Sequence, residues 1–146
     1  MKRIYFYSIL LLLGYFVMHA CRDTIDSSWH KAKIDQKQFD SFLRHHQKHI
    51  TDYDSLLVIP GVGCTGCITN AQSFYYDHKE SPKILFIFTD IQDPKIFRQE
   101  VPDSLWQRPN IIVDLDDRWP EVDFQSIYPG LFRIYNKKLF YKIFES

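Results

Sequence analysis

Residues 55–67 read Ser-Leu-Leu-Val-Ile-Pro-Gly-Val-Gly-Cys-Thr-Gly-Cys, and this stretch decides which fold class the sequence predicts. Its apolar start is stopped by Pro60-Gly61, which predicts a buried strand that ends in a tight turn. Apolar residues then recur at helical spacing, at Ile68, Ala71, Phe74 and Tyr75. A helix is therefore expected from about Thr65 to Asp77. Cys64 and Cys67 would lie where the strand ends and the helix begins.

Helices and strands alternate along the rest of the chain. Asp35 can cap a first helix, and Gln38 can close a capping box with it. Asp93 followed by Pro94 predicts the start of another helix. Strands are expected over residues 83–89 and 110–115, and a hairpin over 131–135 and 139–144. This order predicts an α/β fold in which helices cover the faces of a sheet.

The composition limits the classes of function. The chain has 146 residues, with 18 basic and 18 acidic side chains and a formal net charge of zero. No cationic excess is available to neutralise phosphates, so nucleic acid is not expected as the main partner. The three cysteines are an odd number, which leaves one of them outside any internal pair.

The N-terminus has the pattern of an export signal. Lys2 and Arg3 precede an apolar run over residues 4–18, which is shorter than a membrane-spanning helix requires. The run stops at His19-Ala20-Cys21, and a small residue directly before a cysteine resembles the cleavage site of bacterial lipoproteins. We expect a signal peptide over 1–20, a lipid on Cys21 that anchors the protein to the membrane of the cell envelope, a tether over 21–30 and the folded domain over 31–146. The alternatives are a plain secretory signal with a free Cys21, or an uncleaved anchor.

Removal of the signal peptide changes the charge and the cysteine count. It deletes Lys2 and Arg3 and no acidic residue, so 18 − 2 = 16 basic residues remain against 18 acidic ones, a net charge of −2. With Cys21 at the membrane, Cys64 and Cys67 become an even pair in an oxidising compartment.

The spacing and the place of Cys64 and Cys67 point to redox chemistry. At a helix N-terminus, unsatisfied N–H groups and the helix dipole favour a thiolate, so the pKa of the Cys64 thiol is expected to fall. Cys64 is the candidate nucleophile, and Cys67, nearly one turn later, can resolve a mixed disulfide. A disulfide between these cysteines would stabilise the fold only weakly, because closing so short a loop removes only about 2 kcal/mol of unfolded-state entropy.

On these residues the sequence resembles the thioredoxin superfamily, over about residues 34–144. The matching pieces are the strand and cysteine pair within 56–67, the helix after them, the strand 83–89, and Tyr128-Pro129 before the hairpin. The spacing from Cys67 to Pro129, 129 − 67 = 62 residues, accommodates the extra segment 110–115 and resembles the membrane-anchored, TlpA-like branch. Exported lipoproteins with such domains are familiar in Bacteroidota.

The resemblance implies a three-layer sandwich with a mixed central sheet. It implies a thiol-disulfide oxidoreductase without a cofactor or metal, whose partners are protein thiols or disulfides of the cell envelope. It also implies that Pro129 is a cis-proline beside the cysteine pair, and that Tyr128 faces the substrate strand. Cys64 would attack a substrate disulfide, and Cys67 would resolve the mixed disulfide. The direction of electron flow is not fixed by Thr65-Gly66.

Three departures from the family pattern leave other functions open. Gly63 replaces the aromatic residue that usually precedes the first cysteine, Val58 stands where thioredoxins bury an acid, and the chain stops at Ser146 without the family's last helix. One alternative is a non-catalytic envelope binding lipoprotein with a permanent disulfide. A third hypothesis is a copper-handling protein, because thiolates suit copper(I). The two-residue spacing between the cysteines counts against copper.

Two further clusters suggest metal sites at first reading. His45, His46 and His49 fall in the last turn of the first expected helix, where polar or cationic side chains complement the helix dipole. Asp114, Asp116 and Asp117 lack the ligand spacing of a calcium loop and are expected at a solvated strand end. No metal is therefore predicted at either cluster.

Overall fold

A computed structural model of the chain describes residues 27–123, 127–136 and 138–144. The expected signal peptide over 1–20 and the expected lipid site at Cys21 lie outside the described residues. No helix in the described part of the chain is long and apolar enough to cross a membrane.

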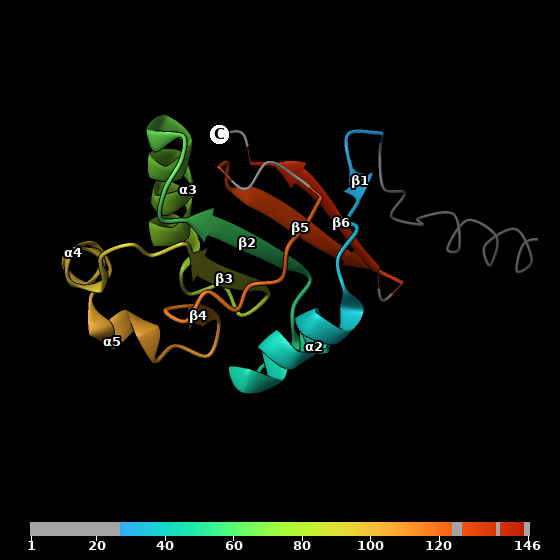
Figure 1. Cartoon of the computed structure of the whole chain (residues 1–146), viewed down its shortest axis with the longest axis horizontal. Coiled ribbons are helices and arrows are strands. Elements are labelled where there is room, and N and C mark those ends of the chain that lie inside the picture. The colour runs from blue at the N-terminus through green and yellow to red at the C-terminus, as the bar shows by residue number, and fades with distance from the viewer. Residues whose placement is uncertain (1–26, 124–126, 137, 145–146) are drawn as a thin grey trace, which may run out of the picture.

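The described strands form one mixed sheet of six strands in the order β1-β6-β5-β2-β3-β4 (Figure 1). The strands are β1 (His30–Lys31), β2 (Ser55–Pro60), β3 (Ile84–Thr89), β4 (Ile111–Val113), β5 (Gly130–Tyr135) and β6 (Lys138–Ile143). β2 is parallel to β3 and antiparallel to β5, with Val58 opposite Ile87 on one side and Gly130 on the other. β4 is parallel to β3, while β6 is antiparallel to β5 and to β1. The parallel strands β2, β3 and β4 therefore end at the same edge of the sheet.

Three of the described helices begin where the sequence predicts, and two short ones were not predicted. The helices are α2 (Gln36–His45), the short 3₁₀ helix η1 (Ile50–Asp52), α3 (Thr65–His78), α4 (Pro94–Glu100) and α5 (Asp103–Trp106). Asp35 caps α2, because its carboxylate accepts a hydrogen bond of 3.0 Å from the Gln38 backbone N–H. Asp93 caps α4 in the same way, accepting from the N–H groups of Lys95 and Ile96. The two aspartates fix the starts of helices on opposite faces of the sheet.

Two apolar cores lie on the two faces of the sheet. Figure 1 shows α2 and α3 on opposite sides of the sheet. Successive side chains of a strand alternate between faces, so Leu56 and Val58 enter one core and Leu57 and Ile59 enter the other. α2 covers the first core with Phe39, Phe42 and Leu43, all almost fully buried. α3 covers the second with Ala71 and Tyr75, joined by Phe97 of α4. The prediction of an α/β fold with helices on the faces of a sheet is confirmed.

The folded part begins earlier than the prediction, at the edge of the sheet next to β6. Trp29, expected in the tether, is only 8% exposed and lies between Arg133 and Lys142, whose cationic groups are 4.8 and 5.3 Å from its ring. Strand β1 follows directly and pairs with β6. The folded part therefore includes residues 29 and 30, two positions before the expected boundary, because a long-range contact with the hairpin orders them.

Tyr75 carries a polar group that the second core does not satisfy. Its ring is fully buried against Phe86 and Phe88, and its hydroxyl has no hydrogen-bond partner among the described residues. Burial raises the pKa of Tyr75 to about 12, because the core disfavours the phenolate. The aromatic ring supports the fold, whereas the hydroxyl carries a desolvation cost.

We expect Tyr75→Phe to raise the free energy of unfolding by about 1 kcal/mol, because it removes an unpaired buried hydroxyl and keeps the ring. Tyr75→Ala should lower it by about 3–5 kcal/mol, because a large cavity replaces the ring. Urea unfolding of both variants measures the difference. A Tyr75→Phe variant less stable than the wild type would show that the hydroxyl has a stabilising partner.

Candidate functional site

Cys64 and Cys67 lie at the junction of β2 and α3, as the sequence predicts. They form a disulfide with their Cα atoms 5.3 Å apart, and both residues are partly exposed. Cys64 is the N-cap residue of α3, and its carbonyl accepts a hydrogen bond of 2.9 Å from the Ile68 N–H. A thiolate formed at Cys64 after reduction would face the unpaired N–H groups of the first turn of α3.

Gly63 allows a close contact between the cysteine loop and the chain before β5. Its φ angle is +136°, which side chains rarely adopt, and a Cβ atom there would collide with the Ile127 backbone. The next residue, Cys64, donates its N–H to the Ile127 carbonyl over 3.0 Å. An aromatic side chain before Cys64 therefore has no room in this protein.

Ile127 contacts the cysteine loop, but Pro129, two residues later, is not a cis-proline. The described residues contain no cis peptide bond, so the Tyr128–Pro129 bond is trans and the expectation is wrong. The trans form is the lower in energy for most bonds before proline. Pro129 is buried, and its carbonyl accepts a hydrogen bond of 2.8 Å from the Phe144 N–H. No pattern in the sequence indicates the contact that Ile127 makes with Cys64.

A groove of about 470 Å³, lined by both apolar and polar residues, lies beside the loop before Cys64. It runs between the loop after β2, the first turns of α3, and the segment that joins β3 to α4. The apolar residues that line it are Ile59, Pro60, Val62, Ile68, Phe88, Ile91, Ile96 and Phe97. Gly63 and Thr65, the chain neighbours of Cys64, lie at its rim. Sequence reasoning missed this groove, because its walls come from three separate segments.

Asp90 lines a second cavity, of about 230 Å³, together with Val58 and Tyr128. Burial raises the pKa of the Asp90 carboxyl, and the nearby Asp117 carboxylate raises it further. The Thr89 hydroxyl, 3.5 Å away, opposes the shift by donating a hydrogen bond to the charged form. Val58 itself is a buried apolar residue. Position 58 has no carboxyl, but Asp90 lines the same cavity as Val58. The Asp90 carboxyl keeps its proton to a higher pH than an ordinary aspartate.

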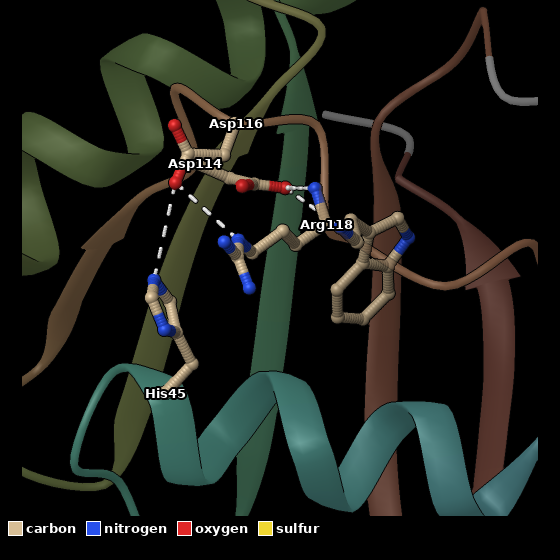
Figure 2. Close-up of polar contacts among 5 residues, drawn as sticks. His45, Asp114, Asp116 and Arg118 are labelled. Carbon is tan, nitrogen blue, oxygen red and sulfur yellow. Dashed lines mark hydrogen bonds and ion pairs between the residues drawn. The ribbon is translucent and has the colours of Figure 1, made fainter.

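The aspartates after β4 do not form a uniformly solvated strand end. Asp114 is only 1% exposed, and one carboxylate oxygen accepts hydrogen bonds from the N–H groups of Arg118 and Trp119, at 2.8 and 2.7 Å. The exposed Asp116 forms ion pairs with His45 and Arg118 (Figure 2). Asp114 therefore shapes the turn after β4, and for this residue the expectation of a solvated position is wrong. A buried acceptor that organises a turn leaves no pattern in the sequence.

Metal ligands do not gather in the described part of the chain. No group of three or more His, Cys, Asp or Glu side chains there is arranged to hold a metal ion. His45 is 4.0 Å from Asp116, and its ring lies against that of His46 with centroids 4.9 Å apart. Cys64 and Cys67 are joined to each other, and no described histidine completes a three-ligand copper site with them.

Comparisons with known proteins identify no relative of this chain. No family model matches the sequence, and neither a curated protein nor a solved structure gives a significant match.

The two glycines near the cysteines should respond to substitution in opposite ways. Gly63→Ala is expected to lower the free energy of unfolding by about 1–3 kcal/mol, because it combines a strained φ with a backbone collision. Gly66→Ala is the matched control: it lies within α3, and a Cβ there meets no described atom within 4 Å. We expect this variant to raise the free energy of unfolding by about 0.5–1 kcal/mol, because alanine has a higher helix propensity than glycine. Equal effects in urea unfolding would contradict the role assigned to Gly63.

His46 should make part of the stability depend on pH. Its Nε2 atom is buried without a hydrogen-bond partner among the described residues. Burial lowers the pKa of His46, and the neighbouring His45 lowers it further, while Asp114 opposes the shift. The unfolded chain therefore takes up this proton first as the pH falls below about 6.5. Stability present above that pH is lost as the pH falls through the lowered pKa of the folded state.

We expect His46→Gln to lose less stability than the wild type between pH 7.5 and pH 5, as measured by urea unfolding at the two pH values. His49→Gln, at an exposed position, is the control and should lose as much as the wild type. An identical loss in His46→Gln would show that His46 is protonated equally in both states.

Proposed function

We propose that this protein is a thioredoxin-like thiol-disulfide oxidoreductase of the cell envelope. The proposal is carried by one observation: the Cys64–Cys67 disulfide lies at the N-terminus of α3, directly after a strand that is buried on both faces. The order of the strands around β2 supports a thioredoxin-like sandwich, with two parallel neighbours on one side and an antiparallel hairpin on the other. The buried end of β2 positions the loop that carries the cysteines, while both cysteines remain partly exposed to solvent.

The chemistry requires only the two cysteines and a substrate disulfide. In the reducing direction, the Cys64 thiolate attacks one substrate sulfur, and the substrate disulfide breaks. The other substrate sulfur leaves as a thiolate and takes up a proton. Cys67 then loses its proton and attacks the Cys64 sulfur, which forms the internal disulfide and releases the second substrate thiol. Two electrons and two protons pass to the substrate, and the oxidising direction reverses every step.

Several residues around the pair support this exchange. The N-terminal N–H groups of α3 stabilise the Cys64 thiolate as nucleophile and as leaving group. The segment before β5 borders the pair through the bond from Cys64 to Ile127, so Tyr128 and Pro129 are the proposed neighbours of a bound substrate. Asp90, which keeps its proton to a higher pH than an ordinary aspartate, lines the same cavity as Tyr128.

The place of the protein in the cell follows from the N-terminal sequence. We propose export by the signal over 1–20 and a lipid anchor on Cys21, with the folded domain held at the membrane surface of the cell envelope. An oxidising compartment suits a protein whose cysteines form a disulfide. Its proposed partners are the thiols or disulfides of other envelope proteins.

A non-catalytic binding protein on the same fold is the second candidate. The observation that favours it is the buried, apolar Val58, since no carboxyl at that position assists proton transfer to the second cysteine. In this case Cys64 and Cys67 form a permanent disulfide, and the sheet edge binds a partner without electron transfer.

Trapping separates the two candidates. In the cell, Cys67→Ser should accumulate mixed disulfides between Cys64 and partner proteins, because the resolving thiol is absent. Non-reducing gels should show adducts that disappear on reduction. Cys64→Ser is the matched control and should give few adducts, because it lacks the proposed attacking thiol.

The second measurement is made on the purified protein. A catalytic pair predicts a Cys64 thiol with a pKa below its ordinary value, and a disulfide that dithiols reduce reversibly. An ordinary thiol pKa together with a disulfide that resists reduction would leave the binding protein as the better description.

A further inference from the structure

We propose that one face of the sheet, formed by β1, β5 and β6, binds the anionic headgroups of the membrane in which the lipid on Cys21 is inserted. The cationic side chains of this face are Lys31, Arg133, Lys138 and Lys142, and we call it the cationic face. The inference rests on the proposed lipid anchor and is independent of disulfide exchange. It adds a defined orientation of the folded domain on the membrane.

The strand register places the four cations on one side of the sheet. The opposite pairs on this side are Leu131 with Lys142, Arg133 with Phe140, Tyr135 with Lys138, and Lys31 with Phe140. Directly opposite residues point to the same side of a sheet, and so do alternate residues of one strand. Phe132 and Leu139, at intervening positions, are buried in the first core. The cationic face therefore lies on the other side, which is the side of α3.

The cationic face is open to solvent. On this side α3 contacts β2, whereas β1 lies at the far edge of the sheet beyond β6 (Figure 1). Lys31, Arg133 and Lys138 are exposed, and Lys142 is half-buried. Two half-buried aromatic rings lie among them, those of Tyr135 and Phe140, with centroids 6.4 Å apart. Cations beside aromatic rings are favoured where a protein meets the headgroup region of a membrane.

Trp29 holds two of the cations close together. Its buried ring lies 4.8 Å from the Arg133 guanidinium and 5.3 Å from the Lys142 ammonium group. The ring attracts both cations, although the two positive charges repel each other. An anionic headgroup beside them would relieve this repulsion. A pair of cations fixed on a buried ring therefore favours an anionic partner.

Acidic side chains do not neutralise the cationic face. β1, β5 and β6 contain no Asp or Glu. None of the four cations forms an ion pair with an acidic residue in the described part of the chain. Asp123 approaches the hairpin from the opposite side, where its carbonyl accepts a hydrogen bond from the hydroxyl of Tyr141.

The charge of the protein is divided between this face and the remainder. Without the signal peptide the net charge is −2, so the chain outside the four cations carries −2 − 4 = −6. An anionic surface attracts the cationic face and repels the remainder, which orients the domain. A second copy of the chain is a poor occupant, because pairing two cationic faces would bring like charges together.

The proposed anchor brings the cationic face to the membrane. Trp29 begins the folded part and follows Cys21 by 29 − 21 = 8 residues. Eight residues span at most about 28 Å, so a lipid on Cys21 keeps β1 within that distance of the bilayer. A short tether raises the effective concentration of the face at the membrane surface. Each Lys or Arg near an anionic surface then strengthens binding about fivefold.

The test uses the full-length lipidated protein in vesicles of phosphatidylcholine, with or without an equal amount of phosphatidylglycerol. A water-soluble reagent acylates lysines to a low extent, and mass spectrometry of peptides gives the rate at each lysine. With phosphatidylglycerol, Lys31 and Lys138 should react about fivefold more slowly than in phosphatidylcholine alone. Lys37, exposed on α2 across the sheet, is the internal control and should react at an unchanged rate. Salt at about 0.5 M should abolish the difference by screening.

Two variants locate the effect. Lys31→Glu should reduce the slowing at Lys138 from about fivefold to below about twofold, because it reverses one charge of the cationic face. Lys37→Glu makes the same change of charge on the opposite side and is the matched control. In this control the slowing at Lys138 should equal that of the wild type. Urea unfolding verifies that both variants are folded.

The outcomes separate this inference from the other proposals. Mass spectrometry of the N-terminal peptide shows whether Cys21 carries a lipid, and its absence would overturn both the anchor and this inference. With the lipid present, equal rates in the two kinds of vesicle, or equal slowing at Lys37, would overturn this inference alone. Slow labelling of Lys31 and Lys138 in intact cells but not in anionic vesicles would overturn it in favour of an acidic protein partner. The redox proposal is unaffected by any of these results.

Discussion

Burial of β2 on both faces is the constraint on which the rest of the protein depends. All of residues 56–60 are buried between the parallel β3 and the antiparallel β5. Because side chains alternate along a strand, one apolar strand supplies two separate cores and requires a helix layer over each. The same packing holds the end of β2 in place. The cysteines follow this rigid end directly, so their position is set by the core.

A second constraint is the close approach of the cysteine loop to the chain before β5. Gly63 permits the approach, and the hydrogen bond from Cys64 to Ile127 uses it. The loop is thereby fixed on the side of β5, while its other side opens toward α4 and the groove. Gly63 thus excludes a bulky side chain directly before Cys64.

Polar groups tie the far edge of the sheet to the helices. The Pro109 carbonyl, just before β4, accepts hydrogen bonds from the Tyr53 hydroxyl and the Lys48 ammonium, at 2.7 and 2.6 Å. After β4, Asp114 accepts two backbone N–H groups and forms the next turn. A three-residue strand is short, and these bonds at both its ends hold it on β3. The sequence pattern around Asp114 suggested solvent exposure because acidic residues are usually exposed, and only the fold shows the buried acceptor.

The sequence by itself determined the elements whose signals are local. The apolar runs of β2 and β3, the helical period of α3 and the caps Asp35 and Asp93 all follow from neighbouring residues, as does the position of Cys64 at a helix start. Tertiary structure alone decided what depends on distant contacts: the burial of Trp29, the hydrogen bond from Cys64 to Ile127, and the groove made from three segments. The physical reason is the separation along the chain of the residues that determine each feature. A period or a cap is a property of adjacent residues, whereas a collision or a cavity exists only after distant parts of the chain have packed together.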